Sequence, residues 1–433
     1  MRKSADKSRL SLVLILFFFL LLHQVGVSFR DQLSPLVLST FNVSDSWLLQ
    51  SVTLSTIITL IFYIIWGVLF DRLSRKNLLS IAGFIWGSTS ILIGIAPTYP
   101  IYAFSNLLAG IDNASYSGIY ALLSDYFKPR NRGKIIGLFL MAKPLSYVVG
   151  IFLSGVADNV QNWRPFMLMK GGVGFVLAVL IYFFVREPKR GASEPAMAAT
   201  KMTGVYQFDF ELANRMLQKP GVVLIYAISF FGMIPWSALT TYLMPFLREI
   251  QGLSEPLFYQ GILPAIIATS LGYPTSGLLG DVLFSRWKRG RLIIGSAGLI
   301  LPSLFLFLAF DYLARETFLF LVMVMMVGFF MSFTWPNIAA SLLDITLPEV
   351  RGTAIGIVLF FQSIGNLVGA RIVTQIEVQA GSANAILWVS IGGWMVSLVL
   401  LIALFFFIPK DIEKLRRHMA YRSHLEARVA ETQ

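Results

Sequence analysis

Five ionisable residues interrupt otherwise apolar stretches of this sequence: Arg30, Asp31, Asp112, Lys143 and Arg371. A cation in an apolar setting can bind an anionic group or pair with a carboxylate. A carboxylate there can take up and release a proton, because burial disfavours its charged form. An unpaired charge inside a membrane costs about 2.5–3.5 kcal/mol on insertion scales, so each residue is expected to face a cavity or a partner.

Lys143 lies ten residues after Gly133, which is roughly 15 Å along a helix that rises 1.5 Å per residue and therefore near mid-membrane. The following Pro144 removes a helix hydrogen bond and favours a bend beside the charge. Two interpretations remain open. Lys143 either binds an anionic headgroup or forms an ion pair with Asp112 or Asp31.

The acidic candidates predict proton coupling. Arg30 and Asp31 are adjacent, about 100° apart on a helix, so they cannot face the same point. Either one lines a cavity while the other pairs sideways, or both reach the outer interface. We predict coupling roles for Asp31 and Asp112. His23 also changes charge near neutral pH, but a lone histidine is more often packed and hydrogen-bonded.

Neutral polar and aromatic residues complete the predicted substrate site. With Lys143 and Arg30, this site consists of Asn113, Tyr116, Trp236, Gln362 and Asn366. The charged members lie in the first half of the chain and the neutral members mostly in the second. This asymmetry favours an amphipathic organic anion as ligand.

The elements that must position these residues are transmembrane helices. The 433 residues are 56% hydrophobic and 13% charged, with a mean hydropathy of +0.72. That composition argues against a soluble enzyme, a nucleic-acid binder and a disordered chain. The chain has no cysteine, only three scattered histidines and no P-loop. We therefore predict no enzymatic activity, no metal site and no cofactor.

Apolar runs of about 20 residues predict an all-α membrane protein. The expected helices span 10–38, 46–70, 77–96, 101–124, 134–156, 165–185, 220–244, 256–279, 291–310, 315–342, 351–375 and 383–408. The first run resembles a signal peptide, but its apolar character continues to about Phe41. We therefore expect it to be a retained helix.

Charge bias predicts the topology. Most of the 35 lysines and arginines lie in the termini and the even-numbered connections, while the opposite connections hold only Arg164, Arg248 and Arg315. The positive-inside rule places both termini in the cytoplasm, in a plasma or inner membrane. The net charge of +12 therefore reflects topology rather than a nucleic-acid partner.

A polar stretch from Arg186 to Lys219 divides the helices into two sets of six. The predicted domains are an N-terminal bundle (1–189), a cytoplasmic linker (190–219), a C-terminal bundle (220–409) and a basic tail (410–433). Residues 211–219 can form a short surface helix. The arginines of the tail, which include Arg416, Arg417, Arg422 and Arg428, are expected on anionic lipid rather than on a specific partner.

An internal repeat supports this division. Asp125, Pro129, Arg132, Gly133, Gly137 and Gly150 recur 219 residues later as Asp344, Pro348, Arg351, Gly352, Gly356 and Gly369. Gly67 and Asp71 recur 210 residues later as Gly277 and Asp281. Two parallel repeats of six helices, related by an axis normal to the membrane, are a described transporter architecture.

The segment Gly67–Lys76 resembles the signature of the major facilitator superfamily between helices 2 and 3, with Ser74 at a usual glycine position. The resemblance implies the major facilitator fold and a latch that holds the halves together at the cytoplasmic face. The second half repeats the pattern with Asp281, Arg286 and Lys288. The predicted latch residues are Gly67, Asp71, Arg72, Arg75, Asp125, Arg132, Asp281 and Arg351.

Short segments, 113–117, 125–127 and 186–191, are similar to spinster-like transporters, which export lysolipids and related amphipathic molecules. That group tends to have an arginine and a glutamate seven residues apart in helix 4, where this chain has Asn106 and Asn113. Its first helix often carries Asp-Arg, and here the order is Arg30-Asp31. Proton coupling by the relatives' route is therefore not expected.

The sequence thus predicts a monomeric secondary or facilitative transporter. It would move a lysolipid-like amphipathic anion by alternating access, within a shell of membrane lipids. The alternative is a proton-coupled exporter of drugs or small metabolites, in which protons are a second partner. A membrane enzyme would need a nucleophile–base or metal constellation, and we find none in the sequence. A sensor normally carries a soluble output domain, whereas the longest polar segment here is short. We therefore favour neither function.

Overall fold

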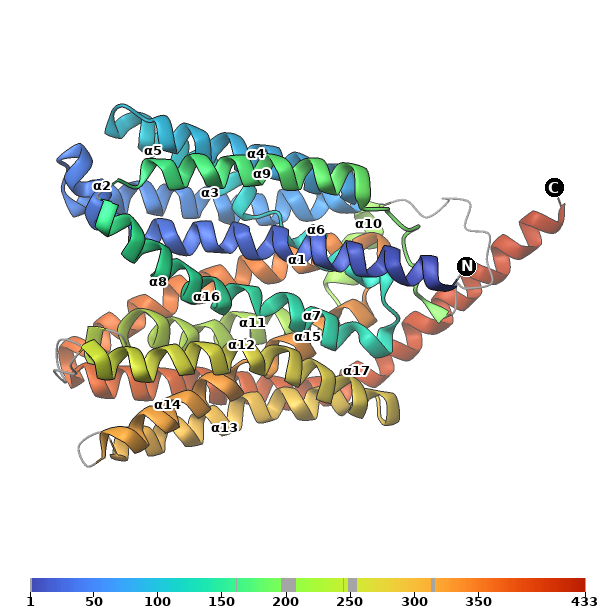
Figure 1. Cartoon of the computed structure of the whole chain (residues 1–433). Coiled ribbons are helices and arrows are strands. Elements are labelled where there is room, and N and C mark those ends of the chain that lie inside the picture. Colours follow the sequence, from blue (N-terminus) through green and yellow to red (C-terminus); the bar gives the residue numbers. More distant parts are fainter. Residues whose placement is uncertain are drawn as a thin grey trace. The chain divides into compact units, whose positions relative to one another are not determined.

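The computed structural model describes residues 2–160, 162–195, 208–243, 245–247, 255–312 and 316–432, which are mainly helical and contain no strand (Figure 1). The first half comprises α1 (Arg2–Gln32), α2 (Ser34–Phe41), α3 (Asp45–Arg72), α4 (Arg75–Ile95), α5 (Tyr99–Asn113), α6 (Tyr116–Tyr126), the 3-10 turn η1 (Pro129–Asn131), α7 (Arg132–Leu140), α8 (Ala142–Val160) and α9 (Arg164–Phe184).

The second half begins with α10 (Phe210–Leu217). It continues with α11 (Pro220–Ser237), the π-helical segment η3 (Ala238–Leu243), α12 (Glu255–Arg286), α13 (Gly290–Tyr312), α14 (Thr317–Met331), α15 (Thr334–Ile345), the 3-10 turn η5 (Pro348–Val350), α16 (Arg351–Ala380) and α17 (Ser382–Thr432). Helix α10 is the short helix predicted for the linker.

Eleven segments in the described part of the chain are long and apolar enough to cross a membrane. A twelfth, formed by α5 and α6, is broken at Ala114 and Ser115. The two segments together match the predicted fourth helix. The predicted all-α membrane fold is confirmed.

Several membrane helices are interrupted beside polar residues. The α5–α6 break follows Asp112 and Asn113, and the α7–α8 break at Met141 precedes Lys143. Irregular backbone at membrane depth is tolerated where it is buried in protein or lines a cavity, and transporters often build binding sites there. The breaks therefore mark the neighbourhood of two predicted site residues.

The chain packs as two compact units: unit 1 (Met1–Leu122 and Ala142–Lys189) and unit 2 (Leu123–Met141 and Arg190–Gln433). In unit 1, α4 lies along α9, α1 packs against α8 and α9, and α3 packs against α5. Small residues allow the closest approach, as is usual between membrane helices. A Cβ added to Gly174 of α9 would lie 3.0 Å from the backbone of Gly87 in α4.

In unit 2, α7 packs against α12, while α11 packs against α16 and α17. The α7–α12 contact is made by backbone. A Cβ added to Gly277 would lie 2.1 Å from the carbonyl oxygen of Gly133, and one on Gly137 would lie 2.3 Å from that of Tyr273. Unit 2 therefore joins a segment of the first sequence half to the helices of the second.

We expect Gly277→Ala to separate α7 from α12, because a methyl group cannot fit 2.1 Å from a carbonyl oxygen. A strained core substitution of this kind costs about 1–3 kcal/mol, so the thermal midpoint of the purified protein should fall. Gly392→Ala is the matched control, since its Cβ would meet nothing within 4 Å. Equal midpoints for both variants would contradict the close approach.

The internal repeat is visible in the structure. Each copy has a three-residue 3-10 turn followed by a helix that starts on an arginine. The first copy is Pro129–Asn131 before Arg132, and the second is Pro348–Val350 before Arg351. The offset of 219 residues holds for every one of these boundaries. The two motif copies therefore fold alike.

The start of the predicted tail is part of α17 and packs within unit 2. Leu415 and Met419 are buried in one cluster with Ala213 and Met216 of α10 and with residues Leu347 and Val350. Arg422 donates to Glu349 at 2.5 Å. The Arg422 guanidinium thus has a carboxylate partner within its own chain, and the placement of the tail on lipid stays a prediction.

Candidate functional site

Unit 1 contains a buried histidine–carboxylate pair. Nε2 of His23 on α1 lies 2.8 Å from Oδ2 of Asp112 at the end of α5. The hydroxyl of Tyr116, which begins α6, lies 3.0 Å from Nδ1 of the same ring. His23 and Asp112 are only 1% and 2% exposed. The broken helix thus supplies both polar partners of the imidazole.

The surroundings of this pair fix its geometry. Trp86 packs edge-on against His23 with ring centroids 5.1 Å apart, and Thr89 donates to Oδ1 of Asp112 at 3.5 Å. When Nε2 donates to Asp112, Nδ1 accepts from Tyr116. Protonation of the imidazole makes both ring nitrogens donors, so Tyr116 must then accept. The pair can therefore hold a proton if the hydrogen bond between Tyr116 and Nδ1 of His23 reverses its direction.

The signature segment of the first half forms its own cluster in unit 1. Arg75 is fully buried, donates to Asp71 at 3.3 Å and also donates to the carbonyl of Ala121 at 3.1 Å. Glu187 accepts from the Arg75 amide at 2.9 Å and from the Ser74 hydroxyl at 2.5 Å, at the start of α4. A carboxylate is favourable at a helix N-terminus.

Unit 2 holds a buried set of charges, which we call the charge network: Arg132, Arg291, Arg351, Asp125, Asp281, Asp344 and Glu194. At its core, the arginine of each repeat copy pairs with the aspartate of the other copy. Arg132 of the first copy donates to Asp344 of the second at 2.5 Å. Arg351 of the second copy lies 3.7 Å from Asp125 of the first. The crossed pairs use residues that the repeat had matched.

Glu194 bridges the two arginines, because one of its carboxylate oxygens accepts from both Arg132 and Arg351. It lies in the polar segment after α9, where the neighbouring Ser193 donates to the carbonyl of Ser124 at 2.6 Å. The Gly191 amide donates to Asp125 at 2.8 Å. The linker is thus fastened to the crossed pairs.

Asp281 of α12 faces the N-terminus of α7. It accepts from the backbone amides of Gly133 at 3.0 Å and Lys134 at 2.9 Å. Arg291 donates to Asp281 at 2.5 Å and also to Asp344. The sequence pattern of the second half included Arg286 and Lys288 beside Asp281, but the arginine that pairs with Asp281 in the structure is Arg291.

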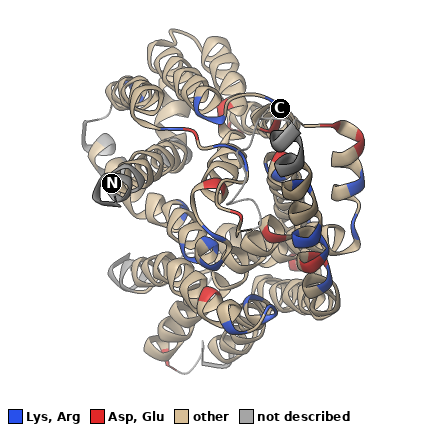
Figure 2. Cartoon of the chain, turned by 90° about the vertical axis from the view of Figure 1, so that its right-hand side faces the viewer, with Lys and Arg blue, Asp and Glu red and all other residues tan. Residues whose placement is uncertain are grey.

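In Figure 2, blue and red stretches stand at helix ends that face the viewer. Within the charge network each arginine is 1% exposed or less. Removing one partner from a buried, hydrogen-bonded ion pair costs about 3–5 kcal/mol, because a charge is left unpaired. The network can therefore hold the joined segments of unit 2 firmly, and it can be opened by neutralising one member.

Burial would raise the pKa of the Glu194 carboxyl, but the guanidinium groups of Arg132 and Arg351 outweigh this effect and lower the pKa to about 2. A depressed pKa stabilises the fold above the pKa of an unfolded glutamate, about 4.3, and this stabilisation is lost as the pH falls toward about 2. We expect the thermal midpoint to fall more steeply below about pH 4.5 in the wild type than in Glu194→Gln. Parallel pH profiles would contradict the bridge.

The other predicted site residues are placed as follows. Lys143 is exposed near the start of α8, and its carbonyl accepts from Ser146, which in turn contacts Ser28 of α1 at 2.9 Å. Arg30 and Asp31 belong to α1, but their side chains lie outside the described part of the structure.

Three further candidates lie on packed helices of unit 2. Trp236 is half-buried near the end of α11, and Gln362 and Asn366 are half-buried one turn apart on α16. The two helices approach closely, because a Cβ on Gly365 would lie 2.1 Å from the carbonyl oxygen of Phe230. Asn113, like Tyr116, is half-buried beside the α5–α6 break. Substrate roles for all of these residues stay predictions.

Of the predicted latch residues, Gly67 is buried on α3 and Arg72 is exposed at its end.

Lys170 of α9 is a further cation that the sequence analysis did not select. A Cβ on Gly26 would lie 2.2 Å from Cε of Lys170 and 2.9 Å from its Nζ. Its side chain therefore lies against α1 one turn from His23. The glycine in α1 is the signal that could have indicated this close approach.

A model of the major facilitator superfamily matches residues 16–370 and 265–426. The chain belongs to this superfamily. Its members are membrane transporters, and the chain is a multi-pass membrane protein of that class.

Two curated relatives are spinster proteins. Protein spinster homolog 1 of Xenopus laevis is 24% identical over 375 residues, which are 80% of this chain and 69% of the relative. The sphingosine-1-phosphate transporter SPNS2 of Danio rerio is 32% identical over 160 residues, only 36% of this chain and 31% of that protein. The predicted resemblance to spinster-like transporters is thereby confirmed.

Among solved structures, a bacterial homologue of the iron transporter ferroportin in its outward-facing state aligns with a TM-score of 0.70. The alignment covers 91% of this chain and 99% of that one at 14% identity. At this identity the likeness shows the fold alone. The predicted major facilitator fold is confirmed.

Proposed function

We propose that this transporter moves a lysolipid-like amphipathic organic anion by alternating access, and that the charge network is the gate at its cytoplasmic end. The single observation that carries the gate is the crossed exchange of ion pairs, Arg132 with Asp344 and Arg351 with Asp125. Each pair joins one repeat copy to the other, so a rocking motion must break both together.

To open the gate, each repeat copy must break the ion pair that its arginine forms with the aspartate of the other copy. The two Arg–Asp pairs are related by the same offset of 219 residues, and one carboxylate oxygen of Glu194 lies against both arginines. Such a network is a two-state element, because a buried ion pair that is half separated is costly. This supports a gate that is either closed or open.

Several observations support an anionic, lipid-like substrate. Cationic Lys143 and Lys170 lie on α8 and α9, which both pack against α1. Charges within membrane helices usually serve a ligand, an ion path or a partner. Gln362 and Asn366 offer neutral polar groups in the second half. A relative matched over 36% of this chain is named for transport of sphingosine-1-phosphate, which joins an apolar chain to a phosphate.

The experiment is uptake of a fluorescent lysophosphatidylglycerol into proteoliposomes. We expect Lys143→Gln to reduce uptake at least about tenfold, because a charge-assisted hydrogen bond to an anion contributes about 1.5–3 kcal/mol. Lys128→Gln removes an exposed cation of the same charge after α6 and should leave uptake unchanged. Wild-type uptake by Lys143→Gln would remove this residue from the site.

The second candidate function, proton-coupled export of drugs or small metabolites, is favoured by the His23–Asp112 pair. A buried imidazole 2.8 Å from a carboxylate can take up a proton and keep it within a membrane. Tyr116 on the other ring nitrogen can reverse its hydrogen bond as this happens. The same pair can drive transport of a lysolipid-like anion, so coupling is compatible with either substrate.

A further inference from the structure

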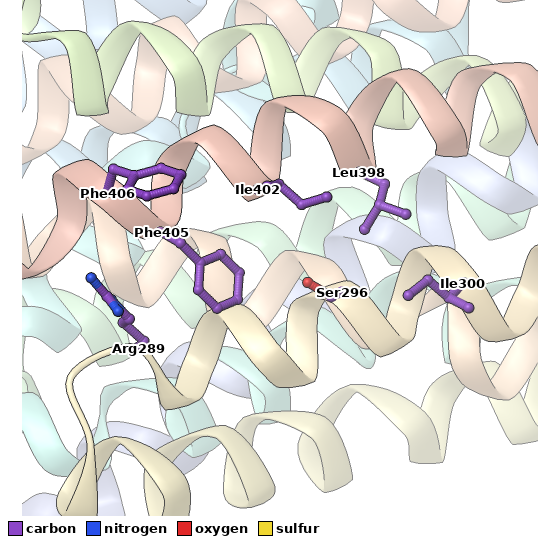
Figure 3. Close-up of a pocket in the computed structure, with 7 residues that line it drawn as sticks. All are labelled: Arg289, Ser296, Ile300, Leu398, Ile402, Phe405 and Phe406. Carbon is purple, nitrogen blue, oxygen red and sulfur yellow. The ribbon is translucent and has the colours of Figure 1, made fainter.

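A groove of about 420 Å³ runs between α13 and α17 in unit 2. Ser296 and Ile300 line it from α13, and Leu398, Ile402, Phe405 and Phe406 line it from α17. Arg289, which directly precedes α13, lies at one end, and Ile300 and Leu398 lie at the other (Figure 3). Apart from Ser296, whose hydroxyl donates to its own helix at Leu292, the walls are apolar up to the guanidinium.

The guanidinium end of the groove has spare capacity for an anion. Nε of Arg289 is buried and has no hydrogen-bond partner among the described residues. Arg289 stands at the N-terminus of a 23-residue helix, where negative charge is favourable. Lys410 of α17 is exposed and continues the i+4 row of Ile402 and Phe406 toward that end. A buried donor without an acceptor is costly, and a negatively charged group would satisfy it.

The dimensions of the groove correspond to one leaflet of a bilayer. From Arg289 to Ile300 is eleven residues, roughly 16 Å at the helical rise, and half of a hydrocarbon core is about 15 Å. Trp287, next to the basic end, is 49% exposed, as expected of a tryptophan at the membrane–water interface. Ile300, Ile402 and Phe406 are also exposed, so the groove opens toward lipid.

We propose that this groove is a binding site for an anionic phospholipid, whose acyl chain lies between α13 and α17 while its phosphate accepts from Arg289. A zwitterionic lipid can fill the apolar part but carries its own cation next to the phosphate. The site therefore selects lipids with a net negative headgroup. It belongs to unit 2, and none of the residues that line it is a proposed substrate residue.

The test is native mass spectrometry of the full-length protein in detergent with added phosphatidylglycerol or phosphatidylcholine. We expect the wild type to retain phosphatidylglycerol in preference to phosphatidylcholine. Arg289→Gln should weaken retention of phosphatidylglycerol at least about tenfold, the loss expected for one charge-assisted hydrogen bond. Arg286→Gln removes an exposed cation at the end of α12 that does not line the groove, and this variant should retain the lipid like the wild type.

A second variant tests the acyl part independently of charge. Ser296→Phe fills the groove and should weaken retention of both lipids while keeping Arg289. Equal losses in Arg286→Gln and Arg289→Gln would overturn the proposal, because they would indicate attraction by loop charge in general. Unchanged retention in Ser296→Phe, or no preference of the wild type for phosphatidylglycerol, would overturn it as well. Circular dichroism of each variant confirms that the helices are formed.

Discussion

Replacing Asp344 with asparagine is expected to speed amide hydrogen exchange at the start of α7 by roughly 150- to 5,000-fold. Asp344 is the shared acceptor of Arg132 and Arg291, and breaking a buried pair costs about 3–5 kcal/mol, which corresponds to that factor. Arg132 is the first residue of α7, and Arg291 holds the Asp281 carboxylate that accepts from the Gly133 amide. Loss of the Asp344 charge therefore weakens both the ion pair of Arg132 and the hydrogen bond of the Gly133 amide to Asp281.

Hydrogen exchange with mass spectrometry on peptides that cover residues 132–140 makes this measurement. Asp209→Asn is the matched control, since Asp209 is the N-cap of α10 outside the charge network and asparagine caps a helix equally well. Exchange at α7 should be unchanged in that variant. Slow exchange in Asp344→Asn would mean that the network does not hold α7, and the proposed gate would fail.

The second large effect concerns the coupling of transport to proton movement. We expect Asp112→Asn to remove the dependence of uptake on a pH gradient. A gradient of one pH unit contributes about 1.4 kcal/mol per proton, which is tenfold in accumulation. An asparagine still accepts a hydrogen bond from His23 but cannot stabilise an imidazolium 2.8 Å away. Substrate exchange without a gradient should persist, because no net proton movement is needed.

Uptake is measured in proteoliposomes with and without an imposed pH gradient. Asp45→Asn, which changes an exposed carboxylate at the start of α3, serves as the control and should keep the full tenfold response. His23→Gln should behave like Asp112→Asn, since it removes the imidazole of the pair. A tenfold response retained in both His23→Gln and Asp112→Asn would exclude this pair from coupling.

The repeat made much of the charge network predictable from sequence. Asp125 and Asp344 stand at one offset, as do Arg132 and Arg351, and the structure pairs each arginine with the acid of the other copy. A sequence repeat indicates which residues are equivalent. It does not indicate that equivalent residues exchange partners, because that depends on how the two copies meet.

Residues without a repeat equivalent were harder to find. Glu194 lies in a polar linker, where an acidic residue ordinarily indicates a solvated surface. In the structure it is 3% exposed and forms ion pairs with both Arg132 and Arg351. Arg291 lies in the first turn of α13, just after a stretch rich in basic residues. The local sequence pattern therefore cannot show that Arg291, rather than Arg286, pairs with Asp281. Long-range packing decides both assignments.

His23 shows the same limit within the membrane. It is 89 residues away from Asp112 in sequence, and no spacing rule connects helices α1 and α5. Asp112 and Tyr116, on either side of the break between α5 and α6, both contact the imidazole of His23. A single histidine in a helical sequence does not predict these partners. The apolar runs, by contrast, predicted the helices well, because hydropathy and length suffice for that purpose.

The most direct measurement of the central claim uses the absence of cysteine from the chain. Ser124 is 1% exposed and lies 3.4 Å from a guanidinium nitrogen of Arg351, so Ser124→Cys places a single thiol inside the charge network. Its labelling by a membrane-impermeant maleimide is followed in proteoliposomes at rest and during uptake of fluorescent lysophosphatidylglycerol. A gate that opens in each cycle predicts slow labelling at rest and at least about tenfold faster labelling during transport. Equal labelling rates while the substrate is being transported would contradict it.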